Sequence, residues 1–72
     1  MNLKLKTKVL ESGKPQIWLA HNIGISESWL SKIVMGWVIA SPRIKNDIAQ
    51  LLNCRVEEIF GNESISETGE DR

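Results

Sequence analysis

Few side chains in this sequence have the type and the spacing that chemistry requires. The chain contains one histidine, His21, and one cysteine, Cys54. Neither has the neighbours of a metal site or the paired base that activates a nucleophile. No paired carboxylates and no phosphate-binding glycine loop stand out either. We therefore expect no enzyme activity, no metal and no cofactor, with His21 on the surface and Cys54 as a small buried thiol.

Charge divides the chain into a basic body and an acidic tail, although the formal net charge is zero. Residues 1–55 carry eight basic and three acidic side chains, a net charge of +5, and residues 56–72 carry six acidic and one basic, a net charge of −5. This split favours a polyanionic partner for the body, with a tail that stays in water or screens the basic face. A solvated surface beside a disordered tail explains the charge equally well.

The length of 72 residues corresponds to one small domain. A core of this size supplies roughly 3–5 kcal/mol of stability, so a second copy or another partner could add to it. The single cysteine excludes an internal disulfide and suits a reducing cytoplasm. No apolar run exceeds four residues, and the N-terminus has no signal-peptide pattern, so we expect no contact with a membrane.

Apolar spacing and capping residues predict five short helices and no convincing strand, which is an all-α fold. The first segment is ambiguous, because its LKLK also alternates as a strand does. The predicted helices cover residues 3–12, 15–23, 26–35, 41–53 and 56–60. The start signals are Pro15, Ser26, and Ser41 followed by Pro42. The stop signals are Gly13, Gly24, Gly36, Asn53 and Gly61. Residues 62–72 are polar and acidic and are predicted to be disordered, which leaves 1–61 as the domain.

Residues 16–33 have the pattern of two helices joined by a tight bend. Gly24 permits the backbone conformation of the bend, and Ala20 is small where the helices must cross closely. A helix-turn-helix has this arrangement, with two helices at a steep angle joined by a short turn that contains glycine. Helical periodicity predicts a core of Leu19, Ala20, Ile23, Ile25, Leu30, Ile33, Ile48, Leu51, Leu52, Val56, Ile59 and Phe60.

The segment PQIWLAHNIGISESWLSKIVMG, followed by IAQLLNCRVEEIFG, resembles the Cro/repressor-type helix-turn-helix domain of the XRE family. That family's usual run is Q-x-x-L-A-x-x-x-G-I-S-x-x-x-L-S-K-I-x-x-G, then I-A-x-x-L and a closing V-x-x-x-F. The matches span residues 16–61. The resemblance implies a compact five-helix, lambda-repressor-like domain in a cytoplasmic, nucleoid-associated regulator encoded by a bacterium or phage. Such regulators usually bind a near-palindromic operator as dimers.

Site residues follow from the same resemblance. The third predicted helix would lie in the major groove. Its base-contacting residues would be Ser26, Glu27, Ser28, Ser31 and Lys32. Lys32 can donate to guanine O6 and N7 or to a phosphate, whereas Glu27 can accept from a cytosine amino group and otherwise repels the backbone. The phosphate-contacting residues would be Lys14, Gln16, Arg43 and Lys45.

The chain departs from the family in the apolar run VMGWVIASP, where members often carry charges. In addition, the turn before Gln16 is about one residue shorter than usual, and Arg55 replaces a small N-cap. The apolar loop either folds onto the core or forms a subunit or partner contact through Trp37, Val38 and Ile39.

The other two tryptophans lie on the predicted helices. The family tolerates a large aromatic that half-covers the core at the position of Trp29, while Trp18 packs on the first helix, contacts a partner or is exposed.

The function expected from this resemblance is sequence-specific binding of double-stranded DNA by a small repressor or Cro-like regulator, as a homodimer. Few positive charges lie on the body, so two half-sites would have to combine for useful affinity. An antitoxin or a restriction–modification controller would have the same fold, and the acidic tail could then bind a protein such as a toxin. A protein-interaction domain that has lost DNA binding is the alternative of a different class. It is favoured by Glu27, the zero net charge and the apolar loop.

Overall fold

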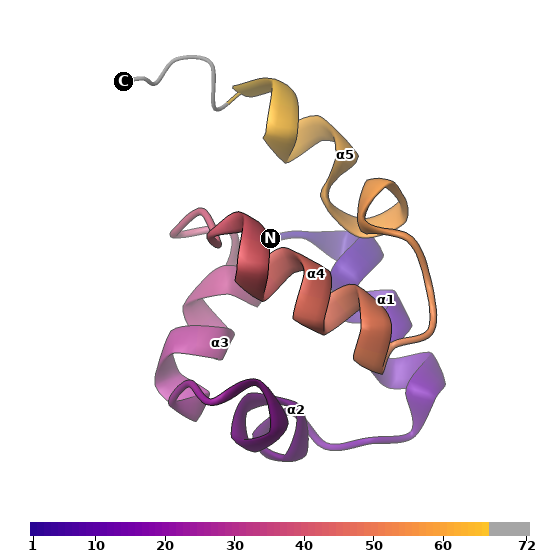
Figure 1. Ribbon diagram of the computed structural model, residues 1–72, viewed down its shortest axis with the longest axis vertical. Coiled ribbons are helices and arrows are strands. Elements are labelled where there is room, and N and C mark those ends of the chain that lie inside the picture. The colour runs from indigo at the N-terminus through magenta and orange to yellow at the C-terminus, as the bar shows by residue number, and fades with distance from the viewer. Residues whose placement is uncertain (67–72) are drawn as a thin grey trace.

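Five helices and no strand make up residues 1–66, the part of the chain that the computed structural model describes, with side chains described as far as Gly61. The helices are α1 (Leu3–Ser12), α2 (Gln16–Ile23), α3 (Glu27–Met35), α4 (Pro42–Leu51) and α5 (Val56–Ser66). This confirms the all-α prediction and settles the ambiguous first segment as a helix. Helix α2 packs against α3 and α4, while α5 packs against α1 and α4 (Figure 1). None of these helices is long and apolar enough to cross a membrane.

The predicted capping residues define most of the helix ends. The hydroxyls of Ser26 and Ser41 accept hydrogen bonds from backbone N–H groups in the first turns of α3 and α4, at 3.1 and 3.3 Å. Asn53 adopts a left-handed conformation after α4, with φ of 59°. Pro15 differs slightly from the prediction, because it is the N-cap of α2 rather than its first residue. Helix ends are therefore specified mainly by local hydrogen bonding.

The end of α5 corrects the prediction that this helix stops at Gly61. The helix continues through Gly61 to Ser66, and its last turns project away from the other four helices (Figure 1). Glycine weakens a helix interior by about 1 kcal/mol relative to alanine but does not forbid it, and Gly61 lacks the positive φ of a helix stop. The disorder expected for residues 62–72 stays a prediction, and 67–72 lie outside the described residues.

The core lies between the helices and contains most of the predicted residues. Nine of the twelve are buried, and the other three, Ile25, Leu51 and Val56, are half-buried against them. The buried apolar residues outside the predicted set are Leu5, Val9, Val34, Ala40 and Ala49. The core therefore extends under α1 and into the segment between α3 and α4.

Asn2 ties the N-terminus to two other helices. Its backbone N–H donates to the Val34 carbonyl at 2.9 Å, and its side-chain amide donates to the Ile59 carbonyl at 2.7 Å. The side-chain oxygen meanwhile accepts from the Leu5 backbone N–H at 3.1 Å and caps α1. One residue thus links α1, the end of α3 and α5 through its backbone and its side chain.

Candidate nucleic-acid interface

A three-residue turn, 24–26, sets the direction of α3 relative to α2. Gly24 has φ of 91°, a conformation that residues with side chains rarely adopt, and its N–H donates to the Ala20 carbonyl at 2.9 Å. The N–H of Ile25 donates to the same carbonyl at 3.1 Å. Ile25 packs half-buried against the core, so the turn is fixed both by hydrogen bonds and by an apolar contact.

Helix α3 presents one apolar face to the core and one polar face to solvent. Leu30, Ile33 and Val34 are buried. The exposed residues are Glu27, Ser28, Trp29 and Lys32, and Ser31 is half-buried. The structure thus brings four of the five predicted base-contacting residues onto one helix. The fifth, Ser26, precedes the helix, and its hydroxyl caps the backbone N–H of Trp29.

Ser28 and Lys32 lie four residues apart and therefore neighbour each other on the outer face of α3. A hydroxyl and an ammonium at this spacing can donate hydrogen bonds to the acceptor atoms of base edges or to phosphate oxygens. Glu27, in the first turn, stabilises the helix dipole but presents a carboxylate on the same surface.

Two lysines, one just before α2 and one on α3, lie over tryptophan rings. The ammonium of Lys14 lies 4.6 Å from the ring centre of Trp18, just before α2 begins. The ammonium of Lys32 lies 6.0 Å from the ring centre of Trp29. Contacts of this kind contribute roughly 0.5–1 kcal/mol at exposed sites, which is enough to favour one direction of a flexible lysine side chain. Trp18 packs half-buried against the core, so it is a support for Lys14.

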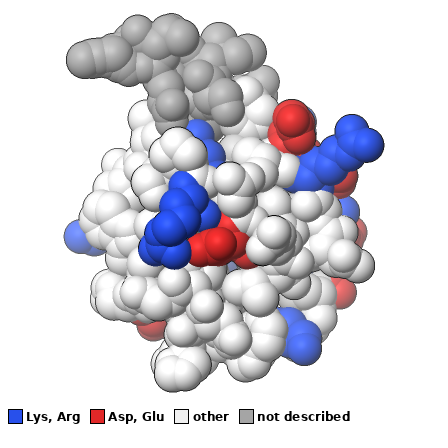
Figure 2. Space-filling view, viewed as in Figure 1, with Lys and Arg blue, Asp and Glu red and all other residues white. Residues whose placement is uncertain are grey.

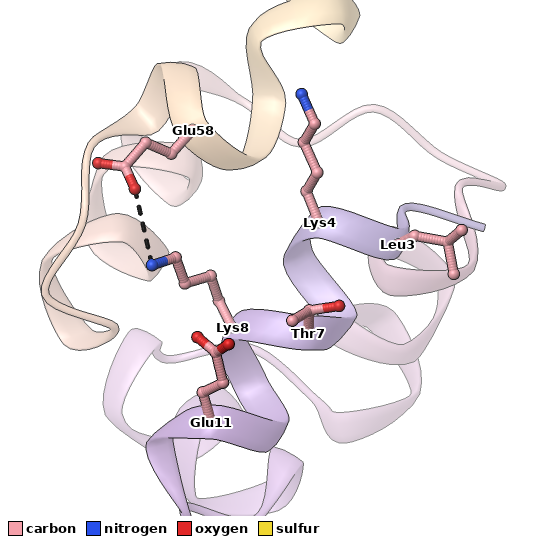
Figure 3. Close-up of a pocket in the computed structure, with 6 residues that line it drawn as sticks. All are labelled: Leu3, Lys4, Thr7, Lys8, Glu11 and Glu58. Carbon is pink, nitrogen blue, oxygen red and sulfur yellow. Dashed lines mark ion pairs between the residues drawn. The ribbon is translucent and has the colours of Figure 1, made fainter.

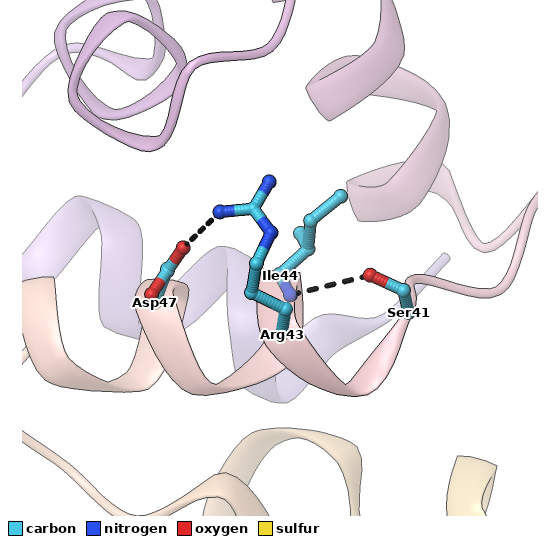
Figure 4. Close-up of polar contacts among 4 residues, drawn as sticks. All are labelled: Ser41, Arg43, Ile44 and Asp47. Carbon is cyan, nitrogen blue, oxygen red and sulfur yellow. Dashed lines mark hydrogen bonds and ion pairs between the residues drawn. The ribbon is translucent and has the colours of Figure 1, made fainter.

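Arg43 and Gln16 occupy the first turns of α4 and α2. The Arg43 guanidinium pairs with the Asp47 carboxylate one turn later at 2.8 Å, as Figure 4 shows, and its side chain remains 65% exposed. A guanidinium has five N–H donors, so this pair leaves others for a phosphate, although Asp47 offsets the charge. Gln16 is half-buried at the N-terminus of α2, where backbone N–H groups point outward.

The burial of Lys45 contradicts its predicted contact with a phosphate. Lys45 lies on the inner face of α4 and is only 5% exposed, and its ammonium sits 5.6 Å from the ring centre of Phe60. A side chain so covered does not offer its charge to DNA at the surface. Lys45 therefore belongs to the packing of α4 against α5, and we remove it from the interface.

The basic side chains do not merge into one patch on the surface that covers α4. Figure 2 shows them separated by uncharged surface on this face. On α1, Lys8 pairs with Glu58 of α5 at 3.6 Å (Figure 3). These two residues line a shallow pocket together with Leu3, Lys4, Thr7 and Glu11. The pocket holds two lysines and two glutamates, so it offers no net charge to a phosphate.

The apolar loop between α3 and α4 is divided between the core and solvent. Ala40 is buried and Val38 is half-buried against the core, whereas Trp37 is 70% and Ile39 is 52% exposed. The backbone N–H of Trp37 donates to the Lys32 carbonyl at 2.9 Å, which holds the start of the loop against α3. Residues 38 and 40 thus face the core, whereas 37 and 39 are exposed, and a partner contact through them stays a prediction.

Metal-binding and nucleophilic groups are not assembled in the part of the chain that the structure describes. No three His, Cys, Asp or Glu side chains within it come together as a metal site. Cys54 is half-buried, and burial, followed by the nearby Glu58 carboxylate, raises the pKa of its thiol. A raised pKa lowers the thiolate fraction at neutral pH and with it the reactivity.

Comparisons with models of known protein families, with curated proteins and with solved structures find no match.

One residue of the surface was missed from the sequence. Asp47 is the partner of Arg43, and their spacing of four residues on a helix is the signal that could have identified the pair. Trp29, expected as a large aromatic that half-covers the core, is 39% exposed on the same helix as Ser28 and Lys32. Its position one residue before Leu30 places it at the border of the apolar face, where periodicity alone does not distinguish cover from exposure.

Proposed function

We propose that this chain is a sequence-specific double-stranded DNA-binding regulator of the Cro/repressor helix-turn-helix type, a small repressor or Cro-like protein without enzyme activity. In this proposal α2, the turn 24–26 and α3 form the helix-turn-helix, and α3 enters the major groove. The observation that carries the proposal is the outer face of α3, on which Ser28 and Lys32 stand exposed while its inner face is locked into the core.

Phosphate contacts would come from elements on either side of α3. Lys14 and Gln16 lie at the start of α2, and Arg43 lies in the first turn of α4. Side chains and backbone N–H groups at helix starts are common partners of phosphate oxygens, and they fix the register of a protein on the duplex. Together with Lys32, each copy supplies three cations to DNA, which supports only modest affinity because affinity rises with the number of phosphates neutralised.

A homodimer on a near-palindromic operator would offset this weak half-site. Linking two half-sites makes the second binding event effectively intramolecular and multiplies the affinity. Trp37 and Ile39, exposed on the loop after α3, are the surface that we propose for the contact between copies. An antitoxin or a restriction–modification controller would use the same surfaces.

A protein-interaction domain is the second candidate, and the exposed loop favours it. Trp37, at 70% exposure, would be unusual on a surface that only faced DNA phosphates, and the pairing of Arg43 with Asp47 lowers the charge nearby. In this candidate the loop would bind another protein, and the polar face of α3 would only be solvated.

Selection of binding sites from a random duplex library tests the two candidates. A DNA-binding regulator should enrich two inverted half-sites whose centres are about one helical turn, 10–10.5 base pairs, or a multiple of it apart. A library that remains unenriched at low salt would exclude the regulator and leave the protein-interaction domain. Lys32→Ala should abolish the enrichment, whereas Lys4→Ala, a lysine of α1 beside α5, should not.

A further inference from the structure

Trp29 is the one large exposed apolar side chain on α3 among those that the structure describes. It lies in the first turn of the helix, and 39% of its surface faces solvent beside the polar residues Ser28 and Lys32. The exposed part adds apolar surface to a helix face that is otherwise made of hydroxyl, ammonium and carboxylate groups.

The surroundings of Trp29 limit its movement. Its backbone N–H donates to the Ser26 hydroxyl at 3.1 Å, which fixes the first turn, and the following residue, Leu30, is anchored in the core. The Lys32 ammonium lies 6.0 Å from its ring centre. An aromatic side chain has only two side-chain torsions, so holding it in place costs little entropy compared with a long polar side chain.

We propose that Trp29 is a specificity-determining residue that contacts the 5-methyl group of a thymine in the major groove, next to a guanine bound by Lys32. This inference rests on the proposed function. Each base pair displays hydrogen-bonding atoms in the major groove, and thymine alone adds an apolar methyl group there. An indole that is already partly exposed gains contact with a methyl group without giving up a hydrogen bond.

The spacing along α3 places this thymine close to the guanine. Side chains three residues apart on a helix have Cβ atoms about 5–6 Å apart, and successive bases of a strand are about 3.4 Å apart along the axis. Trp29 and Lys32 are three residues apart. The thymine should therefore lie one or two base pairs from the guanine in the same half-site.

Replacing thymine by uracil in the selected operator tests the contact directly, because uracil lacks only the methyl group. Each thymine of the half-site is replaced in turn, and affinity is measured by fluorescence anisotropy. Loss of one buried methyl should weaken binding about fourfold at one position near the guanine. In Trp29→Ala the thymine and uracil duplexes should bind equally. Leu10→Ala, which removes an exposed apolar side chain of α1 outside the proposed interfaces, should keep the fourfold difference.

Each failure has a distinct meaning. If the library yields an operator but no thymine is sensitive to uracil, Trp29 does not contact a methyl group, and the proposed function stands. The same holds if the fourfold difference persists in Trp29→Ala, because another side chain must then contact the methyl. If no duplex is enriched, the proposed function itself is wrong. Should Trp29→Ala fail to fold by circular dichroism, Trp29→Gln serves instead, since it retains bulk but offers a polar group to the methyl.

Discussion

Alanine at Gly24 and alanine at Gly61 should change stability in opposite directions, although the chemical change is the same. A Cβ atom built at either glycine meets nothing described within 4 Å, so no clash contributes. The backbone conformations differ: Gly24 ends α2 with φ of 91°, while Gly61 lies inside α5 without a positive φ. The difference in free energy should therefore come from the backbone alone.

The expected magnitudes follow from these conformations. A left-handed conformation costs a residue with a Cβ roughly 1–2 kcal/mol, so Gly24→Ala should destabilise the domain by about that amount. Alanine is favoured over glycine in a helix interior by about 0.5–1 kcal/mol, so Gly61→Ala should stabilise it. In a domain of this size 1 kcal/mol shifts the Tm by about 4–8 °C.

Thermal unfolding followed by circular dichroism measures both variants against the parent. We expect the Tm to fall by at least about 4 °C in Gly24→Ala and to rise by about 2–8 °C in Gly61→Ala. A D-alanine at position 24, introduced by chemical synthesis, favours positive φ and should not destabilise the domain. A lower Tm for Gly61→Ala would refute the continuous α5, because it would mean that Gly61 ends the helix after all.

Three further predictions concern a cap, the loop and the thiol. Ser26→Ala removes the acceptor for the Trp29 N–H and should destabilise the domain by about 1 kcal/mol, or about 4–8 °C in Tm. The control Ser28→Ala alters an exposed serine and should change stability by less than about 0.5 kcal/mol. Equal effects of the two variants in thermal unfolding would contradict the cap. Trp37→Asp should give a folded monomer in gel filtration, and an unchanged dimer would exclude the loop as the contact between copies. Because the pKa of the Cys54 thiol is raised, the folded protein should react with iodoacetamide more slowly than the urea-unfolded chain between pH 8 and 9, and equal rates would show that the thiol is unperturbed. The free energy of unfolding should also fall as the pH rises through that range and beyond, because the unfolded chain loses its thiol proton first.

Features that depend on neighbouring residues were predictable from the sequence. The serine caps of α3 and α4 and the glycine that ends α2 act through hydrogen bonds and torsions within a few residues, so their types specify them. The apolar face of α3 was predictable for the same reason, because Leu30 and Ile33 repeat at helical spacing.

Features that depend on packing were harder to predict. Lys45 was expected at the surface because it is charged, but it shares a face with Ile48, Ala49 and Leu52 and is buried there over Phe60 of α5. The spacings of three, four and seven residues from Lys45 to these apolar residues indicate a shared helix face, but a lysine is normally expected at the surface. The end of α5 was also predicted wrongly, because a glycine stops a helix where it takes a positive φ, and Gly61 does not.

The salt dependence of binding to a random-sequence duplex tests the central claim most directly. In the proposed complex Lys14, Lys32 and Arg43 supply three cations per copy. Each neutralised phosphate contributes about −0.9 to the slope of log K against log salt, so the slope should be about −3 for one copy and about −5 for a dimer. Lys32→Ala should make the slope less steep by about one unit per copy, while Lys4→Ala should leave it unchanged. A flat salt dependence, or equal slopes for the two variants, would contradict DNA binding through α3.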